Sequence, residues 1–202
     1  MIIKNLAICV FSYLLGSISI SILVSKKVYG GDIRALGSGN AGATNMARNY
    51  GLNAGFITLL ADMAKAAVAI LAGFFLLGDE GLALSGMSCL CGHCFPVFYN
   101  FRGGKGVSSG AAIAFAIDWR VGLLAVAAFA VVAFSTRKVS AGSICAALAV
   151  FIGSLLFRVC EPKIGLAVFS MCLVIIRHRE NIKRLIAGTE ADFKPSARKK
   201  TE

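Results

Sequence analysis

The stretch NLAICVFSYLLGSISISILVS, residues 5–25, decides the fold class because it runs for 21 residues without a charged side chain. At about 1.5 Å per residue, a helix of this length crosses the roughly 30 Å hydrocarbon core of a bilayer. The stretch is about twice as long as the core of a signal sequence, and no small-residue cleavage pattern follows it before Lys26, so we expect it to be retained. It therefore predicts a membrane-spanning helix.

The rest of the chain has the same character. Of its 202 residues, 57% are hydrophobic and 15% are charged, and the mean hydropathy is +0.78, which excludes an ordinary soluble domain. Two further stretches, residues 81–101 and 139–157, also lack Asp, Glu, Lys and Arg. Weaker apolar segments cover residues 53–77, 106–117, 121–136 and 164–176. We predict an all-α polytopic membrane bundle of seven transmembrane helices, with residues 1–190 as one domain and residues 191–202 as a short charged cytosolic tail.

The charged residues between these segments predict the orientation. Sixteen Lys and Arg residues fall in the connections and tail on one side, against four on the other, namely Lys4, Arg120, Arg158 and Lys163. The positive-inside rule then places the N-terminus outside and the C-terminus in the cytosol. Every glycine-rich polar connection falls on the cytosolic side, so we expect the chemistry at that face of the membrane.

The first of these connections reads GSGNAGATNMAR, residues 37–48. Each glycine costs about 1 kcal/mol in a helix, so this composition predicts a loop. Such a loop can aim backbone amides and short polar side chains at an anion, with an arginine where the next helix begins. The candidate phosphate-binding residues here are Gly37, Ser38, Gly39, Asn40, Thr44, Asn45 and Arg48.

A second connection contains FRGGKGV, residues 101–107. It is not a Walker A loop, because Tyr99 stands where the first glycine would be and Gly106 stands where Ser or Thr should follow the lysine. It still leads a lysine through glycines into a helix start, which is a favourable place for a phosphate. The candidates are Arg102, Gly103, Gly104, Lys105 and Gly106.

Two more polar elements have the same setting. TRKVSAGSI, residues 136–144, places Ser140 and Ser143 at a helix start, and both are further candidate phosphate-binding residues. RHRENIKRLIAGTE, residues 177–190, places His178 and Asn181 on one helical face. The segment CLCGHC, residues 89–94, does not have the ligand spacing of a closed metal site, so we predict no metal. Inside residues 53–77, Asp62 and Lys65 stand three apart, where a structural ion pair and a functional site are both open.

These four elements are rich in hydrogen-bond donors and poor in carboxylates, and this composition indicates a phosphorylated substrate. The elements lack the usual parts of a phosphoryl transferase. A transporter of a phosphorylated solute is the competing class. It would need polar groups through the depth of the membrane, whereas here they crowd on one face.

In their order and spacing, GSGNAGATN, GHCFPVF with GGKGV, the Ser-x-x-Ser of residues 140–143 and RHRENIKRLIAGTE resemble the bacterial acyl-phosphate-dependent glycerol-3-phosphate acyltransferases. The resemblance implies a seven-span enzyme of phospholipid synthesis, without cofactor, in the bacterial inner membrane. It implies transfer of a fatty acyl group from acyl phosphate to the sn-1 hydroxyl of glycerol 3-phosphate, giving lysophosphatidic acid and phosphate. The catalytic positions it implies are Ser38, Lys105, Ser143, His178 and Asn181, with Arg48 beside them.

The partners implied are the two substrates, membrane lipid and a separate enzyme that makes acyl phosphate, but no nucleic acid. Two proton acceptors stay open for the attacking hydroxyl: His178, which suits general base catalysis near neutral pH, and the substrate phosphate itself.

Overall fold

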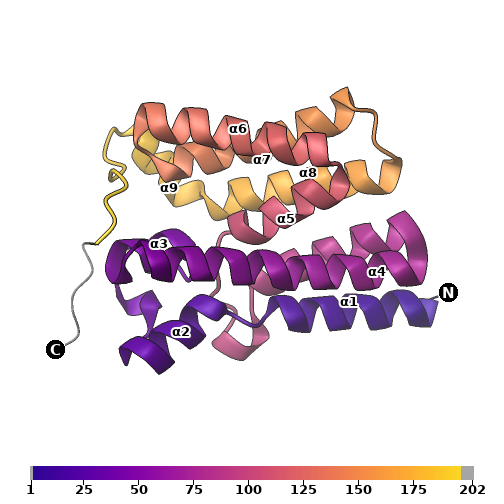
Figure 1. Cartoon of the computed structure of the whole chain (residues 1–202), viewed down its shortest axis with the longest axis horizontal. Coiled ribbons are helices and arrows are strands. Elements are labelled where there is room, and N and C mark those ends of the chain that lie inside the picture. Colours follow the sequence, from indigo (N-terminus) through magenta and orange to yellow (C-terminus); the bar gives the residue numbers. More distant parts are fainter. Residues whose placement is uncertain (1, 197–202) are drawn as a thin grey trace.

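The computed structural model describes residues 2–196, which form helices and loops without any strand (Figure 1). Within that range the helices are α1 (Ile2–Gly16), α2 (Ile20–Tyr29), η1 (Ile33–Ala35), α3 (Ala43–Tyr50), α4 (Leu52–Cys94), η2 (Val97–Tyr99), α5 (Val107–Ile117), α6 (Trp119–Thr136), α7 (Val139–Leu156), α8 (Glu161–Arg177) and α9 (Arg179–Ile186).

The longer helices lie side by side along the long axis of the molecule. Helices α1 and α4 form one layer, helices α6, α7 and α8 form another, and α5 lies between them (Figure 1). The main apolar core lies among α4, α5, α6, α7 and α8. Large apolar side chains such as Phe75 and Phe134 point outward, as expected of a surface that faces lipid. Among residues 2–196, four helical stretches are long and apolar enough to cross a membrane: Ile2–Tyr29, Leu52–Tyr99, Trp119–Thr136 and Val139–Leu156.

Helix α4 contains a sharp kink that accounts for two of the predicted segments. Gly78 leaves the helical region, with φ +62° and ψ −145°, and the two halves of α4 then pack against each other. The Cα of Gly73 lies so close to the Gly81 carbonyl that a side chain at either position would overlap the other backbone. The halves therefore form a hairpin, and this brings residues near 62 opposite residues near 93.

Three predicted boundaries are wrong. The stretch 37–48 is not a loop up to Arg48, because α3 begins at Ala43, where the N–H groups of Asn45 and Met46 donate to the Gly42 carbonyl. Residues 5–25 do not form one helix, because the chain leaves the helix after Gly16 and re-enters it at Ile20. The Lys65 ammonium donates to the Ile18 carbonyl that the break sets free, over 2.8 Å. The segment 81–101 ends as a helix at Cys94, since Pro96 disfavours helical geometry at the residue before it.

Candidate active site

All four polar elements of the sequence meet at one cavity of about 700 Å³. It lies at the end of the bundle where α3, α9 and the segment 189–196 gather, away from the start of α1 (Figure 1). The five predicted catalytic residues all line it: Ser38, Lys105, Ser143, His178 and Asn181. Of the predicted phosphate-binding residues, Gly37, Asn40, Thr44, Asn45, Arg48 and Ser140 line it as well.

The loop before α3 is shaped by Asn45, which is only 1% exposed. Its amide nitrogen donates to the carbonyls of Ile33, Leu36 and Asn40 over 3.0–3.1 Å, and its amide oxygen accepts from the Ser38 backbone N–H over 3.1 Å. The side chain of Asn45 is thus occupied within the loop. It holds exposed Ser38 at the cavity wall.

Lys105 brings a positive charge into the cavity from the loop of residues 101–107, called the glycine loop below. Its ammonium donates to the Asn181 amide oxygen over 2.5 Å. Burial lowers the pKa of Lys105 to about 8, against the opposing effect of the nearby Glu190 carboxylate. The side chain is therefore mostly protonated at neutral pH and loses that charge more readily than an ordinary lysine.

His178 lies between α8 and α9 with its Nδ1 atom 2.8 Å from the Val174 carbonyl oxygen. Since a carbonyl only accepts, Nδ1 carries the proton and Nε2 keeps its lone pair. Burial lowers the pKa of His178 to about 4, so the ring is neutral at pH 7. A neutral imidazole with a free Nε2 can accept a proton from a hydroxyl group.

The cavity also holds a carboxylate that the sequence analysis did not place there. Glu190 is 6% exposed and accepts from Ser140 Oγ (2.6 Å), Asn181 Nδ2 (2.6 Å) and Arg184 Nε (2.7 Å). Burial acts to raise the pKa of Glu190, but these hydrogen bonds outweigh it and lower the pKa below its usual value. The available signal was the acidic residue that ends the motif at residues 177–190.

Part of the cavity wall comes from residues after Glu190. Asp192 pairs with Lys138 over 2.7 Å, Arg48 donates to the Ala191 carbonyl over 3.5 Å, and the Phe193 N–H donates to the Arg137 carbonyl over 3.0 Å. Residues 191–196 of the predicted tail thus pack against α3 and the start of α7, whereas residues 197–202 lie outside the described residues.

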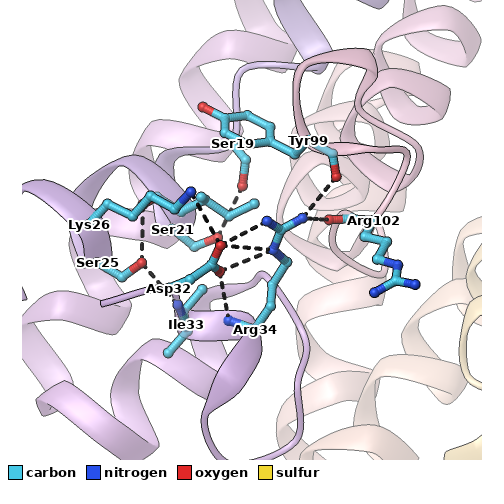
Figure 2. A network of polar contacts seen from close by, with 10 residues as sticks. Ser19, Ser21, Ser25, Lys26, Asp32, Ile33, Arg34, Tyr99 and Arg102 are labelled. Atoms are coloured by element: carbon cyan, nitrogen blue, oxygen red, sulfur yellow. Dashed lines mark hydrogen bonds and ion pairs between the residues drawn. The ribbon is translucent and has the colours of Figure 1, made fainter. Parts of the chain in front are cut away.

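Five predicted phosphate-binding residues do not line the cavity: Gly39, Arg102, Gly103, Gly104 and Gly106. The side chain of Arg102 is exposed, and Figure 2 shows its guanidinium pointing away from the neighbouring polar network. For these residues a phosphate contact stays a prediction.

The glycine loop is held by arginines from two other parts of the chain. Arg34 pairs with Asp32 and donates to the carbonyls of Tyr99 (2.8 Å) and Arg102 (3.3 Å), as Figure 2 shows. Arg177 donates to the carbonyls of Gly104 (3.2 Å) and Gly103 (3.4 Å). The loop therefore has a fixed backbone on which Lys105 is mounted.

A second, apolar cavity of about 210 Å³ adjoins the first. Both are lined by Leu59, Val107, Phe129 and Ser143. The rest of the second wall is built almost entirely from apolar and small side chains of α5, α6, α7 and α8. A ligand with a charged head and an apolar chain fits this arrangement.

Within residues 2–196, no three His, Cys, Asp or Glu side chains lie together in a way that could hold a metal ion. The arrangement offers cationic and hydroxyl donors, the neutral imidazole of His178 and a neighbouring apolar space. It can bind phosphate groups, stabilise an oxyanion and accept a proton.

Known proteins similar to this chain were found by sequence and by structure. A glycerol-3-phosphate acyltransferase of Prochlorococcus marinus (strain NATL1A) is 41% identical over 194 residues, covering 92% of this chain and 96% of that protein. One from Thermoanaerobacter sp. (strain X514) is 36% identical over 182 residues, covering 90% and 92%.

The crystal structure of PlsY, an integral membrane glycerol 3-phosphate acyltransferase, in its glycerol 3-phosphate form has a TM-score of 0.90 at 34% identity, covering 95% of this chain and 96% of that one. Its lysophosphatidic acid form has a TM-score of 0.87 at 33% identity, with the same coverage. The family model for glycerol-3-phosphate acyltransferase matches residues 6–188. The chain therefore belongs to the glycerol-3-phosphate acyltransferase family of integral membrane enzymes.

Proposed function

We propose that the protein transfers a fatty acyl group from acyl phosphate to the sn-1 hydroxyl of glycerol 3-phosphate, giving lysophosphatidic acid and inorganic phosphate. The observation that carries the proposal is the pair of adjoining cavities. The polar one offers donors for two phosphate groups, and the apolar one offers room for part of an acyl chain. The glycerol 3-phosphate and lysophosphatidic acid forms of the similar PlsY support the acceptor and the product.

Five of the polar side chains that line the cavity have a role in this reaction. Arg48 and Lys105 neutralise the phosphate groups, and Ser38 and Ser143 line the cavity where they can donate to the oxyanion of the tetrahedral intermediate. Such a donor is worth roughly 3 kcal/mol in other acyl transfers. The acceptor oxygen forms a bond to the acyl carbon, the bond from that carbon to the phosphate oxygen breaks, and phosphate leaves with the electron pair.

The hydroxyl proton goes to Nε2 of His178. The lowered pKa of this ring keeps it neutral at pH 7, so Nε2 is unprotonated, and the same shift makes the imidazole a weaker base than an ordinary histidine. The rival acceptor is the substrate phosphate, whose second pKa is about 6. Replacing His178 with Gln and measuring turnover at saturating substrate separates the two: general base catalysis by His178 predicts a loss of at least 100-fold, in the range of such catalysis, whereas a loss well under tenfold assigns the proton to the substrate.

The site opens to the cytosol in this proposal, with seven spans and the N-terminus outside, in the bacterial inner membrane. That placement rests on the excess of Lys and Arg at the site's end of the bundle. Both substrates are charged at one end and come from the cell interior, so a separate enzyme that makes acyl phosphate is the partner we expect.

Purified protein in detergent, given acyl phosphate and glycerol 3-phosphate, tests the reaction most directly. We expect release of phosphate and formation of lysophosphatidic acid only when both substrates are present. An active Thr58→Val variant and an inactive Lys105→Met variant serve as controls for the preparation. A transporter of phosphorylated solutes would release no phosphate, and that result would overturn the proposal.

A further inference from the structure

The reaction above leaves one buried group of charged residues unused. Asp62 and Lys65 in α4 are only 2% and 7% exposed, and Asp62 Oδ1 lies 2.8 Å from Lys65 Nζ. Charged groups at such depth are costly, even when paired, and within membrane spans they commonly mark functional sites. Their neighbours therefore decide what they do.

Across the hairpin of α4, the Asp62 carboxylate faces His93. The distance from Asp62 Oδ1 to His93 Nδ1 is 3.6 Å, and among the described residues this nitrogen makes no hydrogen bond. His93 is 5% exposed and lines the polar cavity. The carboxylate thus lies within ion-pair distance of a ring that forms part of the cavity wall.

His93 in turn contacts the glycine loop directly. Its carbonyl accepts from the Gly104 N–H over 3.0 Å, and a Cβ atom at Gly104 would overlap His93 Nε2. The ring therefore packs against the backbone of Gly104, and the next residue is Lys105. A shift of the His93 ring would move the backbone from which Lys105 reaches Asn181.

On the side away from His93, Lys65 contacts the break between α1 and α2. Lys65 donates to the Ile18 carbonyl over 2.8 Å, between α1 and α2. Ser109 in α5 donates to the Asp62 carbonyl over 3.4 Å. The charged pair is thus fixed on two sides, so that Asp62 offers His93 a rigid partner.

We propose that Asp62 and His93 are positioning residues of the active site: the Asp62 carboxylate holds the His93 ring, and the ring sets the Gly103–Gly104 backbone that presents Lys105 to a substrate phosphate. This inference rests on the proposed function for the identity of that phosphate. Neither residue touches the reacting atoms in this arrangement.

The test combines two changes and measures their coupling. His93→Gln keeps a polar side chain but removes the ring. Asp62→Asn is made together with Lys65→Met, so that no lone Lys65 charge is left in the membrane. The melting temperature of this variant shows whether losing the bond from Lys65 to the Ile18 carbonyl disturbs the fold. The His93→Gln protein, the Asp62→Asn/Lys65→Met protein and the triple variant are compared with the parent for kcat, for KM and for the Kd of glycerol 3-phosphate by titration calorimetry.

We expect each of the two variants to raise both KM and Kd about tenfold while kcat changes less than about threefold, because the loss is in phosphate binding. The triple variant should be no worse than His93→Gln alone, since Asp62 acts through His93. Thr58→Val is the matched control. Thr58 is fully buried in the same helix and donates only within it, to the Ala54 carbonyl, so its kinetics should stay those of the parent.

A second measurement does not depend on the reaction. The rate at which an amine-reactive reagent modifies Lys105, relative to exposed Lys27, reports how firmly Lys105 is held. We expect His93→Gln to change this ratio at least about threefold, because release of Lys105 both exposes its amine and returns its pKa from about 8 toward that of an ordinary lysine. An unchanged ratio in folded protein, or additive losses in the triple variant, overturns the inference. If the parent protein neither binds nor turns over glycerol 3-phosphate, the proposed function fails, and the Lys105 labelling alone decides the positioning role.

Discussion

At the scale of single residues, the pKa of Lys105 is strongly changed by its surroundings. Burial lowers its pKa to about 8, so the ammonium loses its proton between pH 7 and pH 9 rather than near pH 10. Glycerol 3-phosphate is already a dianion there, since its second pKa is about 6. We therefore expect kcat/KM to fall as pH rises through about 8.

The matched variant for this prediction is Lys105→Arg, whose guanidinium stays charged throughout that range. The alkaline fall in kcat/KM should move upward by more than about one pH unit in this variant, even if the activity at pH 7 is lower. A pH profile measured from 6.5 to 9.5 on both proteins checks it. The same alkaline fall in Lys105→Arg would assign the titration to another group.

Glu190 determines which way the Asn181 amide points. A carboxylate only accepts, so the Asn181 NH₂ group must face Glu190 and the amide oxygen must face Lys105. Glu190→Gln keeps the size of the side chain but can donate as well as accept. We expect kcat/KM to fall at least about tenfold because Asn181 can then turn over and leave Lys105 unpaired, a loss of about 1.5 kcal/mol or more for a charged hydrogen bond.

Two measurements on Glu190→Gln show whether the effect is local. The melting temperature in detergent should fall by a few degrees at most, and Glu190→Asp, which keeps the charge, should recover part of the activity. An active Glu190→Gln enzyme would mean that the orientation of Asn181 does not depend on the carboxylate.

At the scale of helices, the packing of α4 on itself depends on glycine. The Cβ of an alanine at Gly73 would overlap the Gly81 carbonyl and lie 2.5 Å from Ser85 Oγ. Overpacking of this kind costs about 1–3 kcal/mol, so we expect Gly73→Ala to lower the melting temperature by several degrees. Activity well below the melting temperature should stay normal, because Gly73 is not part of either cavity wall.

Gly165→Ala in α8 is the control for Gly73→Ala. The nearest atom to a Cβ there, Met87 Cε, is 3.8 Å away, which is an ordinary contact. Alanine favours a helix over glycine by about 1 kcal/mol, so this variant should be as stable as the parent or slightly more stable. Equal melting temperatures for the two variants would mean that the two halves of α4 can move apart at Gly73 without loss of stability.

The helices could be predicted from the sequence where they depend on a local run of apolar residues. A helix occupies each of the seven predicted segments, and α5 begins within one residue of its predicted start. The break at Ile18 was not predictable, because the carbonyl that it frees is satisfied by Lys65, 47 residues away. No charge or proline near residue 18 marks it.

The same limit applies to the site. Ser38, Lys105 and His178 could be predicted because glycines and polar residues interrupt apolar sequence around them. Glu190 and the wall formed by residues 191–196 could not, since their partners Ser140 and Lys138 come from the start of α7. In isolation that stretch has the composition of a solvated tail.

At the scale of the whole molecule, charge and apolarity are separated along the long axis. The cavity and its cationic side chains lie at one end of the bundle, and the apolar cavity extends from it between α5, α6, α7 and α8. A substrate with a charged head and an acyl chain can therefore enter from the membrane with its head at the aqueous face. The orientation of the protein in the membrane therefore determines which compartment supplies glycerol 3-phosphate.

The orientation can be tested with the cysteines of the chain. Cys160 is exposed at the start of α8, with its sulfur 3.3 Å from Asp79 Oδ2, on the side that we predict to be outside. We expect a membrane-impermeant maleimide added to intact cells, with the outer layers made permeable, to label Cys160, and Cys160→Ser to remove that label. In the Cys160→Ser background, a cysteine introduced by Lys27→Cys should react only after the membrane is opened, because Lys27 lies with the basic connections that the positive-inside rule assigns to the cytosol. The reverse labelling pattern would mean that the predicted orientation is wrong. The cavity would then open to the outer face, and glycerol 3-phosphate would have to come from that side.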